Sequence, residues 1–288
     1  GVTEETFLRI RKNRYPMIPR GYVHGYSDRE ADRLSDQAST LTGLLHHDTR
    51  FPPGSHVLEA GCGTGSQTII IAGQNPECRF HSVDISPASL EIARGRVQET
   101  LGNSGSDRVT FQEADITRLP YPDGTFDHIF ICFVLEHLAD PVAALRETRR
   151  VLVRGGSITV IEGDHGSVFF PPEGEAARDA IRCQIELQKR AGGDACIGRR
   201  LFPMLREAGF STPHVSPRMV YVDAATPGLA DGFTRRTFTT MIEGVREEAV
   251  KAGIISRERF DQGTSELLRT CGPDGVFSYT FFKANALK

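Results

Sequence analysis

Short apolar runs alternate with helix-type patterns between residues 55 and 162 of the chain. The apolar runs lie at 56–59, 80–84, 109–111, 126–134 and 157–161. The segments with helical spacing lie between them, at 67–73, 87–101 and 141–152. Runs that are continuously apolar are typical of strands buried on both faces. This alternation predicts a parallel sheet with helices on both sides, an α/β fold.

The chain before this region predicts one helix. Ser27 and Glu30 have the spacing of a capping box, in which each side chain accepts a backbone N–H of the first turn. Apolar residues then recur at helical spacing and predict a helix over about 28–46. His46 to Asp48 are interpreted as its solvated end. We expect residues 1–50 to form an N-terminal lid and helix.

The pattern changes beyond residue 162. Two helices and then two strands are predicted, at 176–191, 201–208, 215–222 and 276–283. Between these strands, 224–272 is a mostly helical insertion that is longer than a loop requires. We expect 163–198 and 224–272 to cap the carboxyl edge of a sheet whose core spans 51–223 and 273–288.

Composition and charge remove several classes of protein. Hydrophobic residues make up 39% and charged residues 25% of 288, as in an ordinary globular protein, and the net charge is −3. Without a dense basic run, nucleic acid and anionic membrane surfaces are disfavoured as partners. No apolar run reaches the ~18 residues of a membrane span, and the first residues carry no secretory signal. The six scattered cysteines favour free thiols in a reducing cytoplasm over disulfides or zinc.

A glycine-rich turn follows the first predicted strand and precedes a helix, over residues 57–65. Gly61 and Gly63 can adopt backbone angles that are closed to other residues, and they allow a ligand to lie against the main chain. The turn lies at the carboxyl end of a strand, where open α/β sheets bind their ligands.

Two acidic residues indicate what that ligand is. Glu59 lies two residues before Gly61, where a carboxylate would repel a pyrophosphate but suits a positively charged ligand. The third glycine also comes one residue too early for a dinucleotide fingerprint, which leaves Ser66 in its place. Asp84 ends the second strand 23 residues after Gly61, and it can accept hydrogen bonds from two ribose hydroxyls. The site therefore suits an adenosine-like ligand with a cationic tail.

Together these segments resemble the motifs of class I S-adenosylmethionine (SAM)-dependent methyltransferases. The matching segments are 57–65, 84–86, 114–116, 126–129, 134–138 and 152–156. The last two are similar to the ubiquinone/menaquinone-type and related small-molecule branch. The resemblance implies a Rossmann-like seven-stranded sheet, mostly parallel with an antiparallel last strand, here with helical cap insertions. It also implies SAM as cofactor, S-adenosylhomocysteine as its product and a small-molecule acceptor.

The resemblance also implies which residues hold SAM. They are Tyr26, Glu59, Gly61, Cys62, Gly63, Gly65, Asp84, Ile85, Asp115, Ile116 and Phe133. Among them, Asp115 would meet the adenine amino group, and the ring face of Phe133 would attract the sulfonium. Tyr26 resembles part of a clamp on the methionine carboxylate; its alternative is a packed aromatic beside a helix cap.

Titratable residues gather after the fifth predicted strand, in segment 162–166. There His165, beside Asp164, could act as a general base near neutral pH. The alternatives are a solvated loop or local hydrogen bonds between the carboxylates and the histidine. Tyr22, His137, Glu162 and Phe169 are the candidates for substrate binding. No metal is expected, because no second carboxylate-rich strand end is evident.

The predicted cap and last strands are rich in large apolar side chains, which favour a flat, aromatic acceptor. They are Phe169, Phe170, Phe202, Phe233, Phe238, Met241, Tyr221, Tyr279 and Phe281. By general pattern the chain is similar to bacterial secondary-metabolism enzymes that methylate carbon 3 of indoles. Alternatives are O- or N-methylation of a quinol, phenol or amine, a SAM-binding regulatory protein without transferase activity, and a nicotinamide dehydrogenase. The cap insertions also offer a surface for a homodimer.

Overall fold

The structure, a computed structural model, describes residues 40–288. Its centre is one sheet with the order β3-β2-β1-β4-β5-β7-β6. The strands are β1 (His56–Ala60), β2 (Arg79–Asp84), β3 (Val109–Glu113), β4 (Phe126–Cys132), β5 (Leu152–Phe169), β6 (Ser211–Val222) and β7 (Phe277–Leu287). Neighbours from β3 to β5 pair in parallel, whereas β7 is antiparallel to both β5 and β6. This confirms the expected mostly parallel sheet with an antiparallel last strand.

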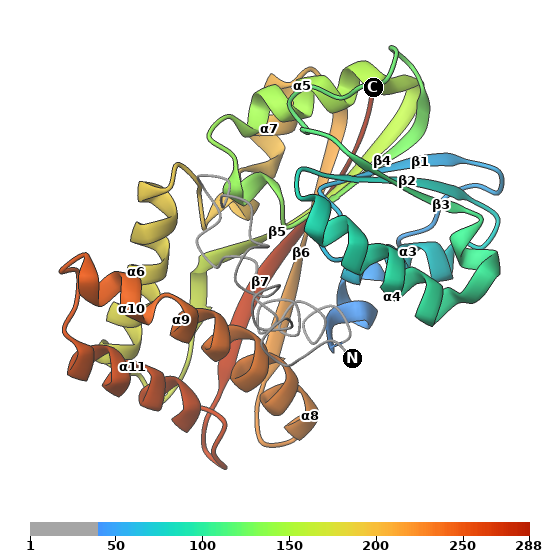
Figure 1. The fold of residues 1–288 in the computed structure, drawn as a ribbon. Helices are drawn as coiled ribbons and strands as arrows, with labels where there is room; N and C mark the ends of the chain where they lie inside the picture. The colour runs from blue at the N-terminus through green and yellow to red at the C-terminus, as the bar shows by residue number, and fades with distance from the viewer. Residues whose placement is uncertain (1–39) are drawn as a thin grey trace, which may run out of the picture.

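Helices cover both faces of the sheet (Figure 1). On one face lie α3 (Ser66–Gln74), α4 (Pro87–Ser106) and a helical segment at 40–46; on the other lie α5 (Pro141–Val151) and α7 (Leu201–Glu207). Successive strand residues point to opposite faces of the sheet and so belong to two different apolar clusters. Phe130 of β4 packs with the first set of helices, and its neighbours Ile129 and Ile131 pack with the second. The strands are thus buried on both sides, as their apolar runs predicted.

Strand β5 is longer than expected, which corrects the sequence-based assignment. We expected it to end at Ile161 and to release 162–166 as a loop. Instead it continues to Phe169, because β7 provides a hydrogen-bonding partner: Gly163 pairs with Phe281 and Phe169 with Ser278. A strand that is distant in the sequence thus keeps this polar, glycine-containing segment extended. The local pattern of residues does not indicate such a pairing.

Helices from two separate segments cover the extended ends of β5 and β7 (Figure 1). They are α6 (Glu175–Arg190), α8 (Pro227–Leu229), the π-helix η3 (Ala230–Thr239), α9 (Thr240–Gly244), α10 (Arg246–Lys251) and α11 (Arg257–Arg269). Helices α6 and α11 pack tightly, since a Cβ on Gly263 would lie 2.4 Å from the Ala176 carbonyl oxygen. Residues 224–272 are therefore mostly helical, as expected.

The helical segment 40–46 is anchored to the last two strands. Lys283 of β7 is 1% exposed, and its Nζ donates to the Leu45 carbonyl at 2.9 Å and to Asp48 Oδ1 at 2.6 Å. Arg218 of β6 donates to the Leu44 carbonyl and pairs with Asp48. Positive charges beside the carbonyls that end a helix are favourable. The rest of the expected 28–46 helix lies outside the described residues.

Candidate functional site

The three glycines of the turn after β1 have different physical requirements. Gly61 and Gly65 both have a φ of +80°; a Cβ on Gly61 would meet Val134 at 2.4 Å, and one on Gly65 would meet Ala93 of α4 at 2.9 Å. These two positions are therefore closed by packing. Gly63 has a φ of +52°, and nothing lies within 4 Å of its Cβ position. The open space is above Gly63, so a ligand can approach the main chain there.

Asp84, at the end of β2, braces this turn. Its Oδ2 accepts the Gly63 N–H at 2.8 Å, and its Oδ1 accepts the Ser86 N–H at 2.9 Å. Burial raises the pKa of Asp84 from its usual value. Each carboxylate oxygen keeps a further lone pair for a hydroxyl donor. Next to it Ile85 is 50% exposed, an apolar surface at the same edge of the sheet.

The segment after β3 lies beside this acid, because Ala114 donates its N–H to the Asp84 carbonyl at 3.0 Å. Ile116 is buried, whereas Asp115 is exposed and its Oδ1 accepts the N–H and the hydroxyl of Thr117. The structure thus brings Asp84, Ile85, Asp115 and Ile116 to one edge of the sheet.

Glu59 is buried in the sheet next to the glycine turn. Its Oε2 accepts hydrogen bonds from the hydroxyls of Thr68 at 2.7 Å and Ser82 at 2.6 Å. Burial raises the pKa of Glu59 to about 7, against the opposing effect of these two hydrogen bonds. A cation near this carboxyl group would favour its ionised form. Burial also raises the pKa of the neighbouring Cys62, which is therefore a neutral thiol.

Phe133 follows β4 in a strained conformation. Its φ is +58°, which is rare for a bulky residue, and its N–H is held by the Ile161 carbonyl at 2.9 Å. Such rare backbone conformations are frequent at ligand sites, where the surrounding contacts hold the residue in place. The ring lies 5.5 Å from that of Phe281, and the next residue, Val134, lies against Gly61 of the glycine turn.

Glu162 of β5 holds the segment after β4. Its Oε1 accepts the N–H groups of Val134 at 3.0 Å and Leu135 at 2.7 Å, at the start of the short 3₁₀-helix η1 (Leu135–His137). Burial, together with the nearby Glu136, raises the pKa of Glu162 well above its usual value. His137 Nε2 lies 3.7 Å from Glu136 Oε1. Glu162 is thus placed to orient η1, with its Oε2 unpartnered among residues 40–288.

Asp164 and His165 point to opposite faces of β5, so the structure does not pair them. Asp164 is buried and forms a bidentate ion pair with Arg199, with both N–O distances 2.7 Å. His165 faces the cap, where its Nδ1 lies 3.1 Å from the Tyr279 hydroxyl and its Nε2 lies 3.2 Å from Met241 Sδ. Sequence reasoning missed Arg199 as a partner.

An aromatic cluster connects Phe133 to His165. We define it as Phe133, His165, Phe233, Phe238, Tyr279 and Phe281. Phe281 lies 4.7 Å from Tyr279, which in turn lies 5.6 Å from Phe238, centroid to centroid. β5 and β7 supply three members and η3 two. Alternation along β7 places Tyr279 and Phe281 on the face that the cap covers.

The other aromatic candidates lie elsewhere. Phe170 stacks on Phe277. Phe202 of α7 is 51% exposed, and it was expected in the cap. Phe169 and Tyr221 are also exposed, and each pairs with Ser278, which places them on the sheet face opposite Tyr279. Tyr22 and Tyr26 lie outside the described residues.

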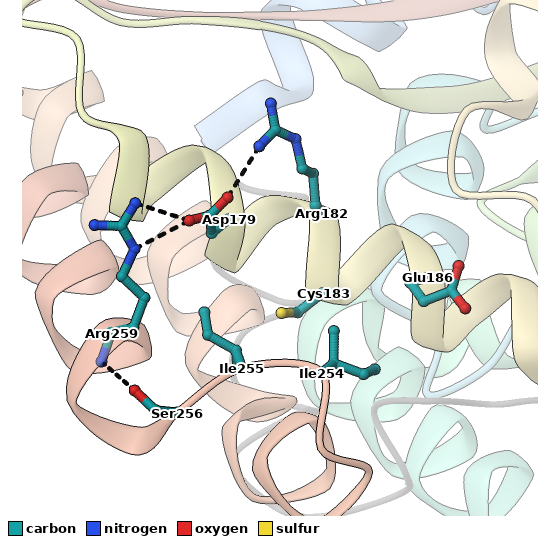
Figure 2. A pocket seen from close by; sticks show the side chains of 8 residues that line it. All are labelled: Asp179, Arg182, Cys183, Glu186, Ile254, Ile255, Ser256 and Arg259. Atoms are coloured by element: carbon teal, nitrogen blue, oxygen red, sulfur yellow. Dashed lines mark hydrogen bonds and ion pairs between the residues drawn. The ribbon is translucent and has the colours of Figure 1, made fainter.

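A surface pocket of about 510 Å³ lies on the cap, between α6 and the start of α11 (Figure 2). Its floor is Cys183, Ile254 and Ile255, and Asp179 on its rim pairs with Arg182 and Arg259. No lining residue belongs to the glycine turn, to the end of β2 or to the aromatic cluster. We therefore do not assign cofactor or acceptor to it.

Among residues 40–288, no helix is both long and apolar enough to cross a membrane. No group of three or more histidine, cysteine, aspartate or glutamate side chains in that range has the arrangement to hold a metal ion.

Comparison with known proteins gives a consistent family. A model described as "Methyltransferase domain" matches residues 58–160. The 27-O-demethylrifamycin SV methyltransferase of Amycolatopsis mediterranei is 30% identical over 79% of this chain and 77% of its own length. Demethylmenaquinone methyltransferase of Symbiobacterium thermophilum is 36% identical, but the match covers only 40% of this chain and 45% of that protein.

A solved structure shares the fold. It is a methyltransferase-like protein of Bacillus halodurans, matched over 87% of this chain and 98% of its own with a TM-score of 0.54 and 18% identity. The glycine turn with open space over Gly63, the acid at the end of β2 and the buried Glu59 fit SAM as cofactor. With these relatives beside that geometry, the chain belongs to the class I SAM-dependent methyltransferases, in their small-molecule branch.

Proposed function

We propose that the acceptor of this methyltransferase is a small aromatic molecule bound against the aromatic cluster. The observation that carries this is the position of the cluster. It begins at Phe133, whose neighbour in sequence, Val134, lies against Gly61 of the turn, and it runs along β7 to His165. A flat ring packs well against such a wall, since aromatic pairs add to the apolar area they bury.

The residues that would hold SAM divide into three roles. Asp84 would accept the ribose hydroxyls, with Ile85, Asp115 and Ile116 around the base. Gly61, Cys62, Gly63 and Gly65 form the turn that the cofactor would follow. Glu59 would offset the positive charge of the methionine part, and Phe133 would present its ring to the sulfonium. For Tyr26 the role of a carboxylate clamp stays a proposal.

When bound, SAM supplies a methyl group on a positively charged sulfur. The chain has to hold the acceptor atom in line with that methyl group, and such positioning can supply about 7–11 kcal/mol of the barrier. The acceptor would supply the electron pair for the new bond, and the sulfur of SAM would keep the pair of its carbon–sulfur bond. His165 would take the acceptor's proton or orient the acceptor. Asp164 would act only by anchoring Arg199 beneath this strand.

Two acceptor atoms are candidates. Carbon 3 of an indole is nucleophilic without prior deprotonation, so the positioning that the cluster provides would suffice. A phenolic or quinol oxygen is the second candidate, and the name of the rifamycin relative, which specifies an O-demethylated substrate, favours it. His137 and Glu162 stay proposals as substrate contacts, alongside Tyr22, whereas Phe169 faces away from the cluster and would not touch an acceptor bound against it.

The deciding experiment is a SAM-dependent turnover assay with a panel of indoles, phenols, quinols and amines. Product analysis by mass spectrometry and NMR would locate the new methyl group. Gly63→Val serves as the control that cannot bind cofactor. Methylation of indole carbon 3 supports the first candidate. Methylation confined to oxygen or nitrogen overturns it, and turnover of only non-aromatic acceptors overturns the aromatic site.

A further inference from the structure

The buried hydroxyl of Tyr279 lies between two strands and touches His165. Tyr279 is 3% exposed, and its Oη lies 3.1 Å from His165 Nδ1. On its other side the imidazole is also in contact, since its Nε2 lies 3.2 Å from Met241 Sδ.

These contacts determine where the hydroxyl proton goes. A phenol has one proton to donate and lone pairs to accept with. The buried Tyr279 proton is satisfied if it is donated to His165 Nδ1, and the Met241 thioether, which can only accept, favours a proton on Nε2. If Nδ1 instead carried the proton, the buried hydroxyl proton would lose this acceptor and the Nε2 lone pair would face the sulfur. The favoured neutral ring therefore carries its proton on Nε2.

Gly163 makes this arrangement sterically feasible. A Cβ at Gly163 would lie 2.2 Å from the Tyr279 oxygen and 3.3 Å from the ring carbon that carries it. The backbone of Gly163 is not in the left-handed region, so glycine is not required for its conformation. It is required because a side chain would occupy the space of the Tyr279 hydroxyl. Any larger residue would push the hydroxyl away from His165.

We infer that Tyr279 is a positioning residue that holds His165 as a hydrogen-bond donor through Nε2, so that His165 orients the acceptor and does not deprotonate it. The inference rests on the proposed function, which places His165 beside the acceptor. It specifies that acceptor further: the molecule presents a lone pair, such as a carbonyl, ether or phenolic oxygen, near the atom that is methylated. Met241, whose thioether faces Nε2, would move aside, as a flexible methionine can.

The first test reads the histidine ring directly in the free enzyme. Long-range ¹H–¹⁵N spectra of histidine-labelled protein distinguish the two neutral tautomers, and His165→Gln identifies the His165 signals. The expected result is protonation on Nε2 alone. Tyr279→Phe should bring in the second tautomer, while Tyr221→Phe, the same change on the exposed opposite face, should leave the spectrum unchanged. Protonation on Nδ1 in the unaltered enzyme, or an unchanged His165 in Tyr279→Phe, overturns the inference.

The second test is kinetic. His165→Gln keeps a donor but cannot take a proton at neutral pH, so it should retain turnover to within about threefold, whereas His165→Ala should lose about tenfold, the scale of one hydrogen bond. Tyr279→Phe should lower kcat by about tenfold with the KM for SAM unchanged. Equal loss in the Gln and Ala variants indicates a base and overturns the donor role.

Gly163→Ala provides an independent variant. It should alter the His165 spectrum as Tyr279→Phe does, and in the double variant the second change should cost little, since the clashing hydroxyl is already gone. Full additivity of the two effects on kcat contradicts the inference. The spectra need no acceptor, so they test the role of Tyr279 independently of turnover. A failure to turn over any aromatic acceptor would refute the proposed function and not this inference.

Discussion

The buried Glu59 carboxyl couples SAM binding to pH. In the free protein its pKa is about 7, so it is largely neutral below that pH. A bound cation favours the ionised form, and binding should therefore release a proton near neutral pH. We expect SAM affinity to rise between pH 6 and 8. Calorimetry in buffers of different ionisation enthalpy measures the released proton, and Glu59→Gln should abolish the release. A pH-independent affinity in the unaltered protein would show that Glu59 does not sense the cofactor.

Gly63 and Gly65 should fail in different ways when they are substituted. Gly63→Val fills the open space of the cofactor, so we expect SAM binding to be lost with the fold retained. Gly65→Ala forces its Cβ against Ala93, so we expect a loss of about 1–3 kcal/mol in stability. Urea unfolding and calorimetric titration on both variants separate the two effects. Equal stability of both variants would contradict this division of roles.

Asp84→Ala should weaken SAM binding by about 1–3 kcal/mol, the scale of hydrogen bonds to a charged group. The structure adds a second reason, because Asp84 also holds the Gly63 and Ser86 N–H groups. Asp84→Asn keeps an acceptor for one of them and should lose less affinity. Calorimetry that gave the unaltered affinity for Asp84→Ala would remove this residue from the cofactor site.

At the scale of elements, the helical segment 40–46 ends on a buried histidine. We expected His46 to be solvated, but it is fully buried, and burial lowers its pKa to about 4. In the unfolded chain the pKa of His46 is near 6.5, so this histidine binds a proton there that it does not bind in the folded protein. Stability should therefore fall as the pH drops from about 6.5 to 4, by on the order of 3 kcal/mol. Denaturant unfolding of His46→Phe against the unaltered protein should show this slope removed.

Glu59 titrates in the opposite sense over part of the same range. Its folded pKa is raised, so its contribution to stability is present at pH 4.5 and is lost as the pH rises through 7. The pH dependence of stability must therefore be measured separately for Glu59→Gln and for His46→Phe. An unchanged pH slope in His46→Phe would show that another group carries the effect.

At the scale of the whole molecule, the cap and the cofactor site should be separable. Gly263→Val would push α11 away from α6, since even a Cβ there lies 2.4 Å from the Ala176 carbonyl. The glycine turn and the end of β2 lie outside this contact. We therefore expect turnover to fall at least tenfold while SAM affinity stays unchanged, the result for a cap that serves the acceptor. Calorimetry and the turnover assay measure the two quantities, and a parallel loss of SAM affinity would argue against a separate cap.

A homodimer through the cap insertions stays a prediction. Sedimentation of the full chain measures the oligomeric state. A dimer that Gly263→Val converts to a monomer would support an interface on the cap.

The sequence by itself determined the α/β order and the cofactor turn. The apolar runs and helix signals are local: Ser86 caps α4 as its spacing to Pro87 indicated, and its hydroxyl accepts the Ser89 N–H. Glu59, Gly61 and Asp84 are recognised by residue type and by their places at strand ends and in a tight turn, although their contacts join distant segments. Residue type and spacing are visible in the sequence, so the pattern alone identifies them.

Only the tertiary structure decided the length of β5 and the surroundings of Asp164, His165 and His46. β5 runs on to Phe169 because β7, more than a hundred residues later, pairs with it. The same extension separates Asp164 from His165 across the two faces of a strand and gives them Arg199 and Tyr279 as partners. His46 is buried because Lys283 and Arg218 draw the end of its helix onto the last strands. Contacts between distant segments leave no local period in the sequence, and only the packed fold shows them.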